Sequence, residues 1–71
     1  MTAYRKIQIE TARGRNGRPV ICHRAVLREW PHPGATYGTI IEASSWFDND
    51  SGLKRANRWR QANQHKEGPV P

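Results

Sequence analysis

The residues of this chain best suited to chemistry are its cations, which fall into three groups along the sequence. Lys and Arg contribute 12 residues against 6 Asp and Glu, giving a formal net charge of +6. Nine of the cations are Arg, whose planar guanidinium binds phosphate or carboxylate in a bidentate manner and stacks on bases. We therefore expect an anionic partner. The candidate binding residues are Lys6, Arg24 and Arg28 in expected strands, Arg13, Arg15 and Arg18 around an expected turn, and Lys54, Arg55 and Arg58 in an expected helix.

Catalytic and metal chemistry find little support in the spacing of the other polar residues. Cys22, His23, His32 and His65 offer no paired CxxC or HxxxH spacing, whereas a zinc site needs three or four converging ligands. An acid–base pair such as His23 with Glu29 comes without an orienting partner. We expect a protein that is not an enzyme and that uses no metal or cofactor.

Residues 50–64 are the segment in which a single element is clearest, a short basic amphipathic helix. At about 100° per residue, Leu53, Ala56 and Trp59 fall within one arc, and the candidate cations of this segment fall on the opposite side. One side of the helix is thus expected to be buried and the other to bind. Residues 67–71, with two prolines and a glycine, are expected to end the helix and to form a flexible tail.

The alternation of apolar and polar residues predicts a first strand, and residue types preferred in turns predict a turn after it. Residues 4–11 alternate, with Ile7 and Ile9 on one face, which is the period of a half-buried strand. Asn16-Gly17 is the pair preferred in a tight hairpin turn, because both residues tolerate positive φ. The three arginines around this pair predict a strongly cationic hairpin tip.

Residues 20–30 are ambiguous. The hairpin signal before them and their β-prone start favour a second strand, while a helical turn or two over residues 23–30 is the alternative. The prolines and glycine of residues 31–34 break any regular element. Residues 36–43 then predict a third strand, for which the pattern does not decide the buried face.

The expected fold is α+β, a β-β-β-α chain with a small three-stranded antiparallel sheet and one C-terminal basic helix packed across one face. Residues 1–66 would form a single small domain and residues 67–71 the flexible tail. At 71 residues with 35% hydrophobic content, the core must be small and depend on a few large side chains. The expected core residues are Ile7, Ile9, Ile21, Leu27, Ile40, Ile41, Trp46, Phe47, Leu53 and Trp59.

A binding face follows from this arrangement. If the helix covers the face that carries Ile7 and Leu27, the opposite face exposes polar strand residues. These are Tyr4, Lys6, Gln8, Arg24 and Arg28. A ribbon of two or three strands can enter a major groove, where Arg and Gln read base edges and flanking cations hold phosphates.

The element order, the basic sheet and the aromatic residue in the terminal helix resemble one known group of domains. They are similar in outline to the small DNA-binding domains, built from a three-stranded sheet and a helix, at the N-terminus of some tyrosine recombinases, and to other compact binding domains of mobile elements. The resemblance implies DNA binding. It includes no diagnostic motif, so it assigns no role to an individual residue.

Two functions are therefore expected as alternatives. The first is a nucleic-acid-binding module of a phage or bacterial mobile element, with DNA as the ligand in preference to RNA. The second is a small inhibitor or adaptor that docks its cations on an acidic or nucleic-acid-handling surface of a host protein complex. An exposed strand edge also allows a homodimer. Without an apolar N-terminal stretch or an internal disulfide, we expect a cytoplasmic protein with no membrane role.

Overall fold

The fold is described from a computed structural model, which covers residues 2–14 and 20–70. The expected turn at Asn16-Gly17 lies outside the described residues. Within them, no helix has the length and apolar character needed to cross a membrane. The elements are β1 (Tyr4–Arg13), β2 (Ile21–Trp30), β3 (Thr39–Ala43), β4 (Phe47–Asp48), α1 (Asn49–Ala62), the 3-10 turn η1 (Gln64–Lys66) and β5 (Gly68–Pro69).

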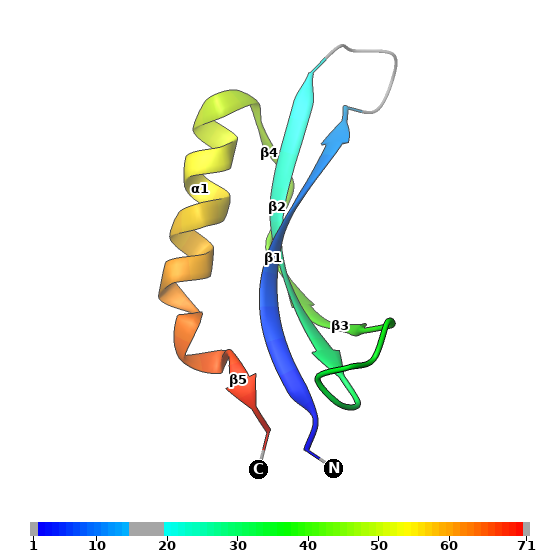
Figure 1. Ribbon diagram of the computed structural model, residues 1–71. Coiled ribbons are helices and arrows are strands. Elements are labelled where there is room, and N and C mark those ends of the chain that lie inside the picture. The colour runs from blue at the N-terminus through cyan, green and yellow to red at the C-terminus, as the bar shows by residue number, and fades with distance from the viewer. Residues whose placement is uncertain (1, 15–19, 71) are drawn as a thin grey trace.

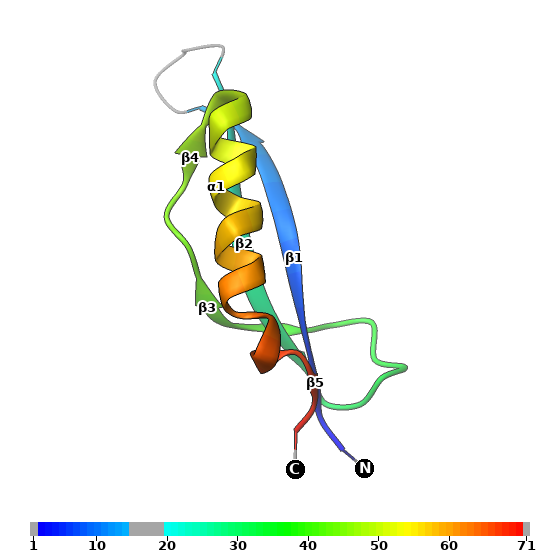
Figure 2. The same ribbon diagram turned by 90° about the vertical axis from the view of Figure 1, so that its left-hand side faces the viewer.

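The sheet is built around the antiparallel pairing of β1 and β2. All ten residues of each strand pair, from Tyr4 opposite Trp30 to Arg13 opposite Ile21. β3 and β4 pair with the other side of β2, and β5 pairs with the start of β1. The sheet is strongly twisted, and α1 runs along one of its faces (Figures 1 and 2). The expected α+β class with an antiparallel sheet and one helix is confirmed, but the sheet has five strands rather than three.

α1 contacts the sheet through its smallest residues. Gly52 and Ala56 are buried, and Trp59 is half-buried against the core. Gly52 permits this close approach, because a Cβ at its position would overlap the carbonyl group of Phe47 and lie 2.9 Å from the Phe47 Cβ. The buried face of α1 is therefore the one that carries Gly52 and Ala56. Leu53, which was expected to be buried, lies on the flank of the helix and is 38% exposed.

The core is smaller than expected and lies mainly on β2. Ile7, Ala25 and Leu27 form a buried cluster under α1, with Ile9 and Trp59 packed against it. Five of the expected core residues are instead exposed, because they lie on the edge strand β3, at the start of β2, in the segment before β4 or on the flank of α1, where no further layer of the described chain covers them. These residues are Ile21, Ile40, Ile41, Trp46 and Leu53.

The boundaries of the strands are partly as expected. The strand interpretation of residues 20–30 is confirmed, because β2 covers Ile21–Trp30 without a helical turn. The third strand is shorter than expected: β3 begins only at Thr39, and residues 31–38 form bends, a turn and irregular chain. Prolines at 31 and 33 account for the irregular start, since each lacks a backbone donor.

Residues 67–70, expected to lie in a flexible tail, are held against β1. Gly68–Pro69 forms β5, and the Val70 N–H donates to the Ala3 carbonyl at 2.8 Å. The Glu67 carboxylate also accepts the Ile7 N–H at 3.2 Å. The sequence did not predict β5 because its proline and glycine were interpreted as part of a flexible tail. A proline can nevertheless occupy an edge strand when its missing donor faces solvent.

We predict that Gly52→Ala lowers the free energy of unfolding by about 1–2 kcal/mol. The added methyl group must push α1 away from the Phe47 backbone, a cost of overpacking that exceeds the helix propensity gained from alanine. Urea denaturation followed by circular dichroism measures the change.

Gly34→Ala is the matched control, because the nearest atom to its added Cβ would be the His32 Nδ1 at 3.6 Å, an ordinary contact. A Gly52→Ala variant as stable as the wild type would show that α1 does not approach the sheet this closely.

Candidate nucleic-acid interface

The face of the sheet that points away from α1, called the open face below, is set by the register of β1 and β2. Ile7 and Leu27 are paired and buried under α1. Because successive side chains alternate between faces, the positions next to them lie on the open face. The residues of the open face are Tyr4, Lys6, Gln8, Glu10 and Ala12 from β1, and Cys22, Arg24, Val26, Arg28 and Trp30 from β2.

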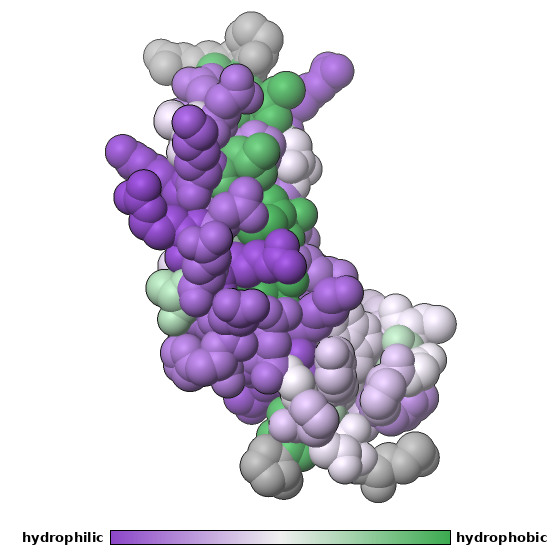
Figure 3. Space-filling view, turned by 60° about the vertical axis from the view of Figure 1, so that its left-hand side comes forward, coloured by the Kyte–Doolittle hydropathy of each residue, from purple (hydrophilic) through white to green (hydrophobic). Residues whose placement is uncertain are grey.

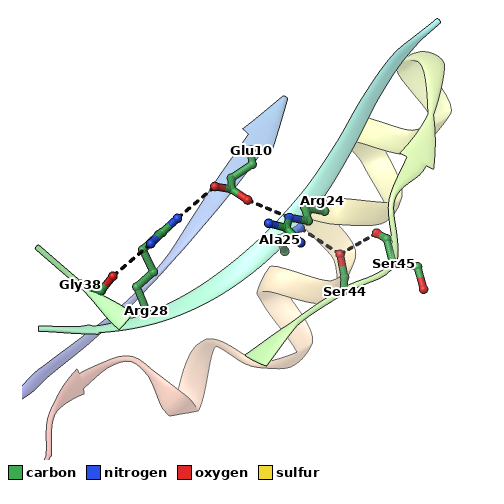
Figure 4. Close-up of polar contacts among 7 residues, drawn as sticks. All are labelled: Glu10, Arg24, Ala25, Arg28, Gly38, Ser44 and Ser45. Carbon is green, nitrogen blue, oxygen red and sulfur yellow. Dashed lines mark hydrogen bonds and ion pairs between the residues drawn. The ribbon is translucent and has the colours of Figure 1, made fainter. Parts of the chain in front are cut away.

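An ion cluster of Glu10, Arg24 and Arg28 crosses the middle of the open face (Figure 4). The Arg24 Nε donates to Glu10 Oε1 at 2.7 Å, and the Arg28 Nη2 donates to Glu10 Oε2 at 3.1 Å. Mainly through the hydrogen bond from Arg24, and against the effect of partial burial, these partners hold the pKa of Glu10 below its ordinary value. Glu10 therefore stays ionised at neutral pH, and the cluster keeps one positive charge in excess.

The same cluster explains why Val26 is fully buried although it lies on the open face. Val26 stands between Arg24 and Arg28 along β2, and both of these side chains reach Glu10 on the neighbouring strand. Apolar stems of arginine side chains in this position can cover the residue between them while the charged ends stay at the surface.

Both arginines are also held by segments outside the β1–β2 pair. The guanidinium of Arg24 lies over the Trp46 ring, 4.6 Å from its centroid. The Arg28 Nη1 donates to the Gly38 carbonyl at 3.1 Å. Gly38 packs closely on Trp30, since a Cβ added to Gly38 would lie 2.6 Å from the indole. Residues 31–38 thus lie over part of the open face.

Two hollows lie on either side of the ion cluster. The lower hollow, about 290 Å³, is lined by Tyr4, Lys6, Gln8, Trp30, Pro33 and Ala35. The upper hollow, about 420 Å³, is lined by Ala12, Arg13, Gly14, Cys22 and Trp46. The lower hollow places the exposed Lys6 beside the rings of Tyr4 and Trp30. Aromatic rings beside cations are the combination that stacks bases and holds phosphates.

Cys22, in the upper hollow, is not set up as a nucleophile. Its Sγ donates to the Asp48 carboxylate at 3.1 Å, and this hydrogen bond raises the pKa of the thiol. A thiol with a raised pKa stays protonated at neutral pH, whereas the thiolate is the reactive form.

The candidate cations of α1 form a second basic surface. Lys54, Arg55 and Arg58 are exposed, and none forms an ion pair with another described residue. Arg55 lies over the Phe47 ring, 6.0 Å from its centroid. Because α1 covers the face opposite the open face, the sheet separates these cations from Lys6, Arg24 and Arg28 (Figure 1). The nine candidates therefore do not form one site.

Arg13 is exposed at the end of β1, whereas Arg15 and Arg18 lie outside the described residues. Sequence reasoning placed Tyr4, Lys6 and Gln8 on the correct face, because alternation alone decides this. It missed Glu10, Trp30 and Trp46 as parts of the site. The partners of Glu10 depend on the pairing register, which alternation does not give.

The described residues contain no group of three or more His, Cys, Asp or Glu side chains that could hold a metal ion. Comparisons with protein-family models, curated proteins and solved structures found no match for this chain. Functional inference therefore depends on the geometry of the open face and of α1.

We predict that Glu10→Gln lowers the free energy of unfolding by about 1 kcal/mol at neutral pH, because it removes the charge shared by two arginines. The folded pKa of Glu10 lies below its unfolded value, so its stabilisation is complete above the unfolded pKa and is lost as the pH falls through the folded pKa. The difference from wild type should therefore shrink below about pH 4.5.

Denaturation at a series of pH values measures this difference. Glu42→Gln is the control, because its ion pair with Lys66 leaves the carboxylate side chain 46% exposed, and a smaller loss is expected. A Glu10→Gln effect that is absent, or equal at every pH, would contradict the assigned role of the cluster.

Proposed function

We propose that the protein is a small nucleic-acid-binding module that contacts its ligand with the open face. The observation that carries this proposal is the lower hollow, where the exposed Lys6 adjoins the rings of Tyr4 and Trp30. The rings offer stacking surfaces for bases, and the cation offers a contact for phosphate.

The ion cluster supports the same proposal. Arg24 and Arg28 are already held by Glu10, Trp46 and Gly38, so an anion that binds them orders few additional side-chain torsions. The cluster has one positive charge in excess, and the whole chain has a formal net charge of +6. A polyanion is therefore attracted to a surface whose arginines are fixed in advance.

The shape of the open face favours single strands over duplexes. Residues 31–38 lie over one end of it through Gly38, which obstructs the entry of this end into a groove. A single strand can offer unstacked bases to Tyr4 and Trp30 of the lower hollow, whereas a duplex keeps its bases paired and stacked. The preference for DNA over RNA remains a prediction from the sequence.

The α1 surface supports a second candidate function, an inhibitor or adaptor that docks on an acidic protein surface. Lys54, Arg55 and Arg58 share one exposed side of a helix and form no ion pair with other described residues. Arginines that are exposed on a helix and form no ion pair are suited to carboxylate recognition. This function would leave the open face without a ligand.

We predict that Tyr4→Ala weakens binding to short single-stranded oligonucleotides by about tenfold, because one stacking surface is lost. Lys6→Ala should weaken binding about fivefold and lower the salt slope by about one, because one phosphate contact is lost. Fluorescence anisotropy with single-stranded DNA, single-stranded RNA and duplex DNA, each at two salt concentrations, measures these effects.

Lys54→Ala is the matched control, since it removes the same charge from the other side of the sheet and should change affinity less than Lys6→Ala. Equal losses from the two lysine variants would show non-specific attraction by net charge. Weak binding that disappears with salt for all three ligands would remove support for the open face and favour the adaptor.

A further inference from the structure

β1 has a second edge that is open over most of its length. β5 covers only the first two residues of β1, and the next outward N–H, that of Ile7, donates to the Glu67 carboxylate. Along a strand, the backbone groups of alternate residues point to the same side. The N–H and C=O groups of Ile9, Thr11 and Arg13 therefore also point outward, and among the described residues no strand pairs with them.

Apolar surface runs beside this open edge. Ile9 is only partly buried on the α1 side of β1, and Leu53 is 38% exposed. Arg55 contacts Phe47 on the β4 side of the helix, and Leu53 lies about 200° around the helix from Arg55, which places it on the β1 side. Figure 3 shows the resulting band of hydrophobic surface beside the hydrophilic helix.

We propose that this edge binds a second copy of the chain, with the two β1 strands antiparallel around a twofold axis at Thr11. An open edge with apolar surface beside it is a site for strand addition. An isologous pairing uses the same patch twice. With Thr11 opposite Thr11, Ile9 of each copy pairs with Arg13 of the other, and the outward groups of all three residues are satisfied.

The two neighbouring registers, with the twofold axis at Glu10 or at Ile9, are less favourable. An axis at Glu10 would place the two Glu10 ion clusters, each with one positive charge in excess, directly opposite each other, which is destabilising. An axis at Ile9 would bring Thr11 of one copy to Ile7 of the other, whose N–H is already bound by Glu67. An axis at Thr11 avoids both conflicts, since Glu10 then faces Ala12 of the second copy.

Two arginines of each copy lie on the side of this pairing. Arg13 faces Ile9 of the other copy, and Arg60 lies about 20° around the helix from Leu53. A twofold axis perpendicular to the sheet puts both helices on one face, with the two Leu53 side chains nearest the axis. Lys54 and Arg58, on the outer side of each helix, point away from the interface. The open faces of the two copies then join into one continuous surface, which doubles the proposed nucleic-acid interface.

The outer edge of β3 is the competing edge, and it is better protected. β3 has only five residues, and its pairing with β2 shifts register between Leu27 and Arg28. Short edge strands and irregular pairing both discourage further strand addition. The ten residues of β1 pair with β2 without such a shift.

Sedimentation equilibrium over a wide range of concentration tests the proposal on the full chain without nucleic acid. The apparent mass should rise from 8.2 kDa toward twice that value. Thr11→Lys, which places two cations at the axis, should weaken association by about tenfold or more. Thr39→Lys, on the competing edge, is the matched control and should leave association unchanged.

Amide hydrogen exchange of the wild type gives an independent measurement if Thr11→Lys fails to fold. The Ile9 and Thr11 amides should exchange more slowly as concentration rises. A monomer at every concentration, with fast exchange at both amides, would overturn the proposal, even if nucleic acid binds. Dissociation by Thr39→Lys but not by Thr11→Lys would overturn it in favour of the β3 edge.

Discussion

The register between β1 and β2 is the constraint on which the rest of the structure depends. It pairs Ile7 with Leu27 on one face and Glu10 with Arg24 on the other. The first pair starts the core under α1, and the second starts the ion cluster of the open face. A slip of one residue would exchange the two faces of a strand. The buried cluster under α1 and the partners of Glu10 on the open face both depend on this one alignment.

The position of α1 adds a second constraint, because Gly52 and Ala56 let the helix lie close to the sheet. Close packing leaves Lys54 and Arg58 on the outer side and turns Leu53 toward the β1 edge. The molecule therefore has a basic helix surface, an open face with aromatic and cationic residues, and an apolar edge between them. Each of these surfaces suits a different class of contact, which is why one basic chain supports distinct functional proposals.

Alternation and composition were sufficient to predict the class of fold, the strand at residues 20–30 and the face on which Lys6 lies. The sequence did not predict the register of β1 on β2. A two-residue turn at Asn16-Gly17 would place Glu10 opposite His23, whereas the structure places it opposite Arg24. The core was misjudged because large apolar residues were ranked by size. Small residues such as Ala25 and Ala56 are buried instead, since α1 packs closely. β4 and β5, with two residues each, are too short to carry a sequence period.

The central claim, that the open face binds nucleic acid, is tested most directly by the three tryptophan indole N–H signals in ¹H–¹⁵N NMR spectra. Trp30 and Trp46 border the two hollows, whereas Trp59 packs from α1 against the core on the other face of the sheet. On titration with a short single-stranded oligonucleotide near physiological salt, the account predicts shifts for Trp30 and Trp46 and an unchanged Trp59. Shifts confined to the backbone amides of Lys54–Arg58, with Trp30 and Trp46 unmoved, would contradict it and assign binding to the helix.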